Sequence, residues 1–204
     1  VYNPIKDLTL SAVFSYIRDN MNRGYGETLN HISALRDGLA GWSSVGAYTK
    51  MEKLMELTAQ YNKEIGAHKF SVLGGYSYNE TDFEELWIDN YGFQDDYFGG
   101  WHNIGIGSAL KDGKANIGSK KTPTNLIGFF GRATYSFKNR YLLMGALRYE
   151  GASQLWGTDN AWGLFPSVSV GWRITEEAFM KNQKIFDDLK LRVGYGVTGS
   201  QPKD

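Results

Sequence analysis

The chain has no cysteine, only four prolines and three histidines in 204 residues, and no excess of either charge. The lack of cysteine excludes disulfides and thiolate metal sites. A net charge of +0 gives no reason to expect nucleic acid, which favours a basic surface. No apolar run approaches the ~18 residues of a membrane helix. What the chain does have is 25 glycines and 15% aromatic residues, a composition that favours a β-rich protein.

Alternation of side chains is the main structural signal. In the run from Tyr141 to Glu150, tyrosine, leucine and glycine occupy the odd positions, which all fall on one face of a strand. The run from Met51 to Met55 also has helical spacing, but a strand is favoured there because another strand follows almost at once. The pattern predicts an all-β, antiparallel up-and-down meander of about seven strands, at residues 5–18, 42–64, 68–78, 125–137, 141–150, 165–174 and 188–198.

The connections between these strands alternate in length. Short turns are predicted at 65–67 and 138–140, and long polar linkers at 20–41, 79–123 and 151–164. The linker at 175–186 is intermediate, and Glu176, Glu177, Phe179 and Met180 could form one helical turn in it. Long connections at one end of a sheet are typical of outer-membrane barrels, whose tilted strands need ~9–11 residues to cross a bilayer. A soluble meander could show the same rhythm.

The two predicted faces differ in chemistry. One collects aliphatic, aromatic and small residues, and the aromatic residues Tyr141, Tyr149, Trp172 and Tyr195 fall near strand ends, as in the girdles of membrane barrels. The other face would be solvated in a soluble sandwich and would line the lumen of a wide barrel. On pattern alone both remain open. The charged residues of this second face, predicted to face a lumen, are Arg132, Arg148, Glu150, Arg173, Lys190 and Arg192.

The second half of the chain resembles the C-terminal barrel region of the SusC/RagA family of TonB-linked outer-membrane receptors. The order and spacing of several short landmarks carry the resemblance, and residues 61–77 resemble the preceding hairpin more loosely. The family usually has Asp-Gly-Ser-Ser and then Phe-Gly where this chain has Glu150-Gly-Ala-Ser153 and Trp156-Gly157, so this loop need not keep the family's local contacts. The landmarks are Arg132, Tyr135, Arg140-Tyr141-Leu142-Leu143, Arg148, Gly151, Ser153, Trp162-Gly163, Phe165-Pro166-Ser167, Gly171-Trp172-Arg173-Ile174, Glu177, Phe179 and Leu189-Lys190-Leu191-Arg192 through Gly199.

The resemblance implies a segment of a large, plugged transmembrane β-barrel in the bacterial outer membrane. Residues 1–204 are then expected to be a piece of the barrel domain, without the plug domain and the remaining strands. The implied function of the parent is import of glycan or peptide nutrients. Its implied partners are outer-membrane lipid, a SusD-like surface lipoprotein and the TonB complex, which acts through the plug. The alternative from the residues alone is a soluble β-rich carbohydrate-binding module.

Aromatic side chains in the predicted external loops are the candidates for ligand contact. Aromatic faces stack on sugar rings or apolar side chains, while loop asparagine and aspartate supply hydrogen bonds. The competing and more frequent role is packing of the loops against one another or against the partner lipoprotein. The candidates are Trp87, Tyr91, Tyr97, Trp101, Trp156 and Trp162.

Catalytic and cofactor chemistry finds little support. The run from Gly194 to Gly199 matches the dinucleotide fingerprint in letters, but its glycines lie in or at the end of a predicted strand and no helical pattern follows. His31, His68 and His102 lack metal-ligand spacing, and the paired carboxylates, such as Asp95-Asp96, match no calcium loop. No serine has an identifiable histidine and acid partner. The chain is therefore expected to be no enzyme and to hold no cofactor or metal.

Overall fold

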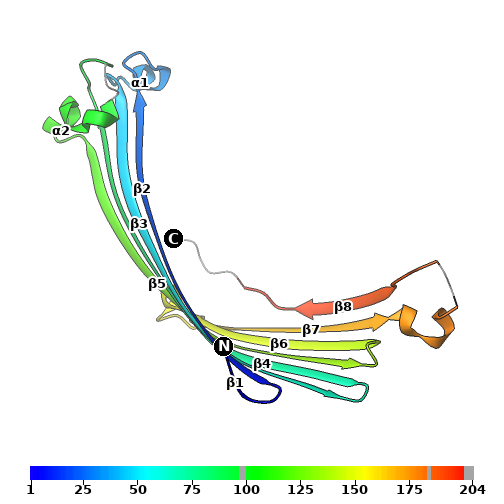
Figure 1. The fold of residues 1–204 in the computed structure, drawn as a ribbon. Helices are drawn as coiled ribbons and strands as arrows, with labels where there is room; N and C mark the ends of the chain where they lie inside the picture. Colours follow the sequence, from blue (N-terminus) through cyan, green and yellow to red (C-terminus); the bar gives the residue numbers. More distant parts are fainter. Residues whose placement is uncertain (97–99, 183–184, 200–204) are drawn as a thin grey trace. The chain divides into compact units, whose positions relative to one another are not determined.

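The computed structural model describes residues 1–96, 100–182 and 185–199. In these residues the chain forms one sheet of eight strands, each beside the next in chain order (Figure 1). The all-β, up-and-down meander predicted from the sequence is confirmed. The strands are β1 (Tyr2–Ile5), β2 (Leu8–Glu27), β3 (Trp42–Ile65), β4 (His68–Tyr91), β5 (Asn116–Phe137), β6 (Tyr141–Ala152), β7 (Trp162–Arg173) and β8 (Lys190–Gly196).

The first predicted strand, 5–18, lies mostly in β2, which a further short strand, β1, precedes across a tight turn. β1 pairs antiparallel with β2, with Tyr2 opposite Leu10 and Ile5 opposite Leu8. The turn between them contains Asp7 at a φ of 72°, in the left-handed region that aspartate tolerates better than most residues. Four residues that include a proline are too short to show alternation, which is why this strand was not predicted.

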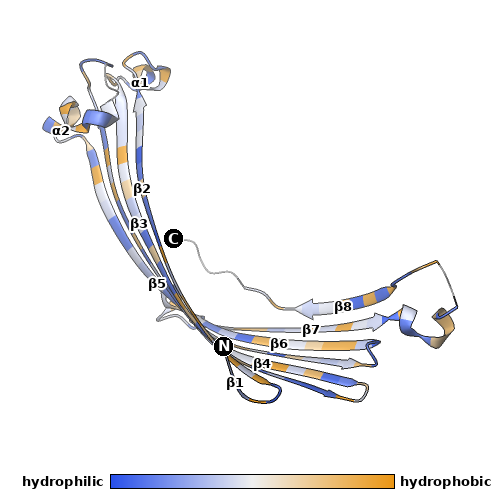
Figure 2. Cartoon of the chain, in the orientation of Figure 1, coloured by the Kyte–Doolittle hydropathy of each residue, from blue (hydrophilic) through white to orange (hydrophobic). Residues whose placement is uncertain are grey.

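β2, β4 and β5 are longer than predicted, at 20, 24 and 22 residues. β3, also of 24 residues, agrees with the predicted strand at 42–64 to within one residue. The predicted linkers 20–41 and 79–123 were therefore drawn too long, because much of each is strand. At ~3.3 Å per residue, 24 residues extend about 80 Å, more than twice what a bilayer crossing needs. A strand with water on both faces has no reason to alternate, so the polar extensions carried no period-two signal. Figure 2 shows hydrophilic residues along the later part of β2.

Short helical segments occupy the connections. They are α1 (Ile32–Arg36), η1 (Gly100–Ile106), α2 (Ser108–Lys111), η2 (Ser153–Leu155), η3 (Ile174–Glu176) and η4 (Ala178–Met180). The last two lie where one helical turn was expected. In the described part of the chain, no helix has the length and apolar character needed to span a membrane.

The chain divides into two compact units. Unit 1 comprises Val1–Ser15, Lys53–Glu80 and the described residues from Thr124 onward. Unit 2 comprises Tyr16–Glu52 and Thr81–Pro123, and holds α1, η1 and α2 at one end of its strands (Figure 1). Each unit is described separately below.

Hydrogen bonds join the short turns of unit 1 to one another. The turn between β5 and β6 places Lys138 and Asn139 at φ of 51° and 54°, a backbone that suits a tight hairpin. The Lys138 N–H donates to the Ala67 carbonyl of the preceding turn at 2.8 Å, and the Arg173 N–H donates to the Arg140 carbonyl at 2.8 Å. These turns therefore lie side by side at one end of the sheet of unit 1.

Candidate functional site

The register of β5 to β8 in unit 1 fixes which residues share a face. Arg132 pairs with Ala146, Arg148 with Phe165, and Glu150 with Gly163. On the last pair of strands, Arg173 is opposite Lys190 and Gly171 is opposite Arg192. All six charged residues that the sequence assigned to a lumen therefore lie on one face of the sheet. That this face lines a lumen remains a prediction.

The opposite face of unit 1 is apolar and uncovered. Phe129, Leu143, Leu147, Val168 and Val170 are between 47% and 55% exposed, although a soluble sheet would bury one face in a core. Among the described residues, Ala152 is the one buried hydrophobic residue of unit 1. Lipid is the solvent that stabilises such a face.

Aromatic residues lie at both ends of this apolar face. Trp162 stacks on Tyr149, with ring centroids 4.7 Å apart, and Trp172 is the cross-strand partner of Tyr141 near the short turns. The two tryptophans are ten positions apart in β7, about 33 Å along the strand and about 25 Å across a membrane at a ~40° tilt. That height equals the apolar band of an outer-membrane barrel. Of the residues that the sequence placed in girdles, Tyr141, Tyr149 and Trp172 lie at its ends, but Tyr195 lies opposite Val168 between them, so its assignment to a girdle was wrong.

The charged face carries a set of local pairs. The Arg148 guanidinium is paired with Glu150, and Arg173 donates to Asp188 at 3.3 Å. Arg192 donates to the Ser169 hydroxyl at 3.3 Å. A face with paired ions and hydroxyls suits contact with water or a polar solute.

Three of the six aromatic ligand candidates lie in strands and not in loops. Trp87 and Tyr91 lie in β4, and Trp162 begins β7 on the apolar face, so their assignment to loops was wrong. Strand pairing continues through these polar extensions, which the sequence pattern could not show. Trp101, in η1, and Trp156, 76% exposed after η2, lie in connections as predicted. Tyr97 lies outside the described residues.

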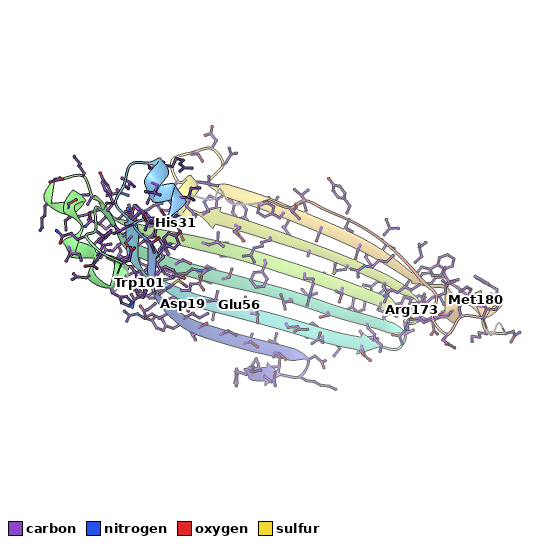
Figure 3. The ribbon with its side chains drawn as sticks, turned by 90° about the horizontal axis from the view of Figure 1, so that it is seen from above. Asp19, His31, Glu56, Trp101, Arg173 and Met180 are labelled. Carbon is purple, nitrogen blue, oxygen red and sulfur yellow. The ribbon has the colours of Figure 1, made fainter. Side chains whose placement is uncertain are left out.

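Two of these aromatics pack on glycines of strands. In unit 2 a Cβ at Gly24 would lie 2.2 Å from the Trp101 ring, and one at Gly118 would lie 2.2 Å from the Trp87 ring. Figure 3 shows Trp101 within the crowded side chains of unit 2. Packing, the competing role considered from the sequence, is thus what the structure shows for these two rings. Trp156 keeps most of its surface free.

Asn90 organises the connection between β4 and β5, a role that no pattern in the sequence indicates. Its side chain is fully buried, at 0% exposure. The amide nitrogen donates to the carbonyls of Ile104 at 2.6 Å and Gly107 at 3.1 Å, and the amide oxygen accepts from the Leu110 N–H at 3.0 Å. One side chain at the end of β4 therefore fixes both η1 and α2.

Glu177 holds the connection between β7 and β8 against the strands of unit 1. Its carboxylate accepts hydrogen bonds from the Tyr141 hydroxyl at 2.7 Å, the Trp172 indole at 3.0 Å and the Arg140 guanidinium at 2.8 Å. The Glu177 side chain is only 13% exposed. The hydrogen bond from Tyr141, then that from Trp172, and the charge of Arg140 lower the pKa of Glu177, against the opposing effect of burial.

We expect this contact to fail at acid pH. Because the pKa of Glu177 is lowered in the folded state, its contribution is complete above the unfolded pKa and is lost as pH falls through the folded pKa. Glu177→Gln should accelerate hydrogen exchange of residues 174–182 severalfold at pH 7, measured on the intact protein by mass spectrometry. The wild type should approach the variant as pH falls below about 4. Glu176→Gln, at an exposed neighbour, is the control; equal exchange in both variants at pH 7 would contradict this role.

The other motifs gain no support. Gly194 and Gly196 lie in β8, where a Cβ would meet Ser169 and Ser167, and no described helix follows them. His31 caps α1, and His68 Nδ1 lies 2.8 Å from the Tyr135 hydroxyl. Within the described residues, no group of three or more histidine or acidic residues could hold a metal ion.

Comparison with known proteins decides the family. Residues 2–202 match the family model described as TonB dependent receptor-like, beta-barrel. The chain belongs to this family. It is therefore part of an outer-membrane receptor protein and not of an enzyme, and it is not a soluble carbohydrate-binding module.

Individual relatives agree with this family. The chain is 32% identical over 205 residues to TonB-dependent receptor P26 of Formosa agariphila, covering 100% of the chain and 20% of the relative. It is 35% identical over 162 residues to TonB-dependent receptor SusC of Bacteroides thetaiotaomicron, covering 79% of the chain and 15% of SusC. The SusC/RagA resemblance is thus confirmed. The chain spans about a fifth or less of these relatives' length.

Solved structures show the same fold. The RagAB peptide importer in its closed-closed state superposes with a TM-score of 0.73 at 24% identity, over 98% of this chain and 21% of that one. A second structure, of the RagAB peptide transporter, gives 0.71 at 23% identity, over 95% and 21%. At these identities the likeness concerns the fold alone.

Proposed function

We propose that the chain is part of the wall of a TonB-dependent transporter that imports glycan or peptide nutrients with a SusD-like surface lipoprotein. The observation that carries the proposal is the two-faced sheet of unit 1, with an uncovered apolar face and a charged face on the same strands. Such a wall separates lipid from an aqueous lumen. The charged residues from Arg132 to Arg192 are then lumen residues.

The rest of the barrel is proposed to come from sequence outside this segment. β1 and β8 end the strand order, and unpaired strand edges are not tolerated in lipid. The remaining strands would pair with these edges, and an interior plug would take up the pull of TonB. Relatives about five times as long leave room for both.

Two comparisons support the proposed cargo and the proposed surface partner. The solved structures with this fold are of a peptide importer, and the SusC/RagA resemblance implies glycan or peptide cargo. Among the candidate aromatics that the structure describes, Trp156 has the largest free surface, in the connection between β6 and β7. It is the first choice for contact with cargo or lipoprotein.

Uptake by cells tests the proposal. Cells with the intact gene and cells with an in-frame deletion would be given fluorescently labelled neutral oligosaccharides, acidic oligosaccharides and peptides. We expect the deletion to abolish uptake of one of these classes, and a protonophore to abolish it in wild-type cells because TonB-linked import is energised. Equal uptake with and without the gene would overturn the transport function. Loss of uptake on deletion of a neighbouring surface lipoprotein gene would support the partner.

A further inference from the structure

An arginine between two phenylalanines crosses three strands on the charged face of unit 1. Phe130 of β5 is the cross-strand partner of Arg148 of β6, and Arg148 is the cross-strand partner of Phe165 of β7. The guanidinium carbon of Arg148 lies 5.8 Å from the centre of the Phe130 ring. We call Phe130, Arg148 and Phe165 the aromatic row. Of the three, the sequence predicted only Arg148 as a residue of the lumen face.

Both rings of the aromatic row lie on glycines. A Cβ at Gly75 would lie 2.3 Å from the Phe130 ring, and Cβ atoms at Gly163 and Gly199 would lie 2.6 and 2.5 Å from the Phe165 ring. A ring this close to the backbone lies low over the sheet. Gly163, two residues earlier in the same strand, and Gly199, after β8, thus let Phe165 form part of the wall surface instead of standing out from it.

Two hollows meet at the aromatic row. One, of about 520 Å³, is lined by Arg148, Glu150, Asn160, Phe165 and Thr198 among others. The second, of about 430 Å³, also contacts Arg148 and Phe165 and adds Glu56, Thr58, Arg132 and Ser167. Both volumes are within the range of small-molecule sites. Phe165 lies at their shared boundary.

Charge in the two hollows is balanced. Arg132 and Arg148 contribute two guanidinium groups, and Glu56 and Glu150 contribute two carboxylates. Glu150 is also the ion-pair partner of Arg148. An ionised ligand would therefore gain no net attraction, whereas an uncharged ligand with several hydroxyls finds both donors and acceptors. Asn160, Thr58 and Thr198 add neutral hydrogen-bonding groups.

We propose that the aromatic row is a subsite for a neutral sugar unit of a glycan. The apolar C–H face of a pyranose ring would stack on Phe165, as apolar rings do on aromatic side chains, while its hydroxyls bond to Arg148 and Glu150. Glu150 sets specificity, because it cancels the charge that would otherwise select acidic sugars. The subsite rests on the proposed import function and narrows its cargo to neutral glycans.

Binding by the purified intact protein in detergent tests the subsite. Probes are the neutral hexasaccharides of maltose, cellulose, xylan and mannan, and hexagalacturonate as the acidic probe, measured by calorimetry. At least one neutral probe should bind the wild type, and Phe165→Ala should weaken it about tenfold, the loss expected for one aromatic contact. Leu164→Ala, at the neighbouring residue on the opposite face, should leave affinity unchanged.

Glu150→Gln tests the role of charge. It should weaken binding of the neutral probe and strengthen binding of hexagalacturonate severalfold, a reversal that a loss of folding would not produce.

Two results would overturn the subsite. The first is unchanged affinity for the neutral probe in Phe165→Ala; a lower melting temperature with it would show that the row packs against another part of the protein. The second is a wild type that binds none of the neutral probes, whether or not it binds hexagalacturonate. In that case cell uptake of peptides or acidic glycans would still support import, so failure of the subsite and failure of the proposed function remain distinct.

Discussion

Val168→Arg should destabilise the barrel by about 2–4 kcal/mol, the cost of an arginine near the bilayer midplane on a lipid-facing strand. Val168 is 48% exposed on the apolar face and lies between the girdle residues Trp162 and Trp172 of the same strand. The expected readout is a lower fraction of heat-modifiable, assembled protein in outer membranes. Unfolding by urea in phospholipid vesicles would give the free energy.

Ser167→Arg is the matched control for this substitution. Ser167 is the preceding residue of β7, and its cross-strand partners Ala146 and Gly196 lie on the charged face. An arginine there would meet water or polar groups, and assembly should stay near the wild-type level. If both variants assemble equally well, or if Ser167→Arg is the more damaging, the assignment of faces to lipid and lumen is incorrect.

The same two faces explain how much the sequence could predict. β6 was predicted at 141–150 and is Tyr141–Ala152, because one of its faces must be apolar and the alternation is forced on the sequence. β4 was predicted to end at 78 and ends at Tyr91. Beyond the apolar band, backbone hydrogen bonds continue with polar side chains on both faces. Apolar and polar side chains alternate only where one face of a strand contacts lipid. The alternation in the sequence therefore stops at the boundary of the apolar band, although the strand continues.

Of the candidate site on the charged face, the sequence predicted the charged residues but not the aromatic ones. Arg148 and Glu150 were assigned to the charged face by their even positions in an alternating strand, and the register agrees. Nothing in the sequence assigns Phe130 and Phe165 to a site, because an aromatic residue on a polar face is an exception to the alternating pattern. Two of the glycines beneath them, Gly75 and Gly199, are far from the rings along the chain, and Gly163 alone is close in sequence. Only cross-strand register brings Gly75 under Phe130.

Asn90→Leu should release the connection between β4 and β5. The substitution removes the groups that pair with the Ile104 and Gly107 carbonyls and with the Leu110 N–H, all at a fully buried side chain. Each unpaired buried group costs about 1–3 kcal/mol, so the local free energy of opening should fall by roughly 3 kcal/mol or more. A fall of that size corresponds to an increase of at least about a hundredfold in the open population. Tryptic cleavage after Lys111 and Lys114 in the intact protein measures it.

Asn116→Leu separates this role from a general effect of losing an asparagine. Asn116 begins β5 in the same unit and donates to the Asp89 carboxylate at 2.8 Å, but its side chain is exposed. Water replaces that partner when the amide is lost, so cleavage after Lys111 should change less than about threefold. Equal cleavage of the two variants would show that packing of Trp101 on Gly24 and Gly26, and not Asn90, holds η1 and α2 in place.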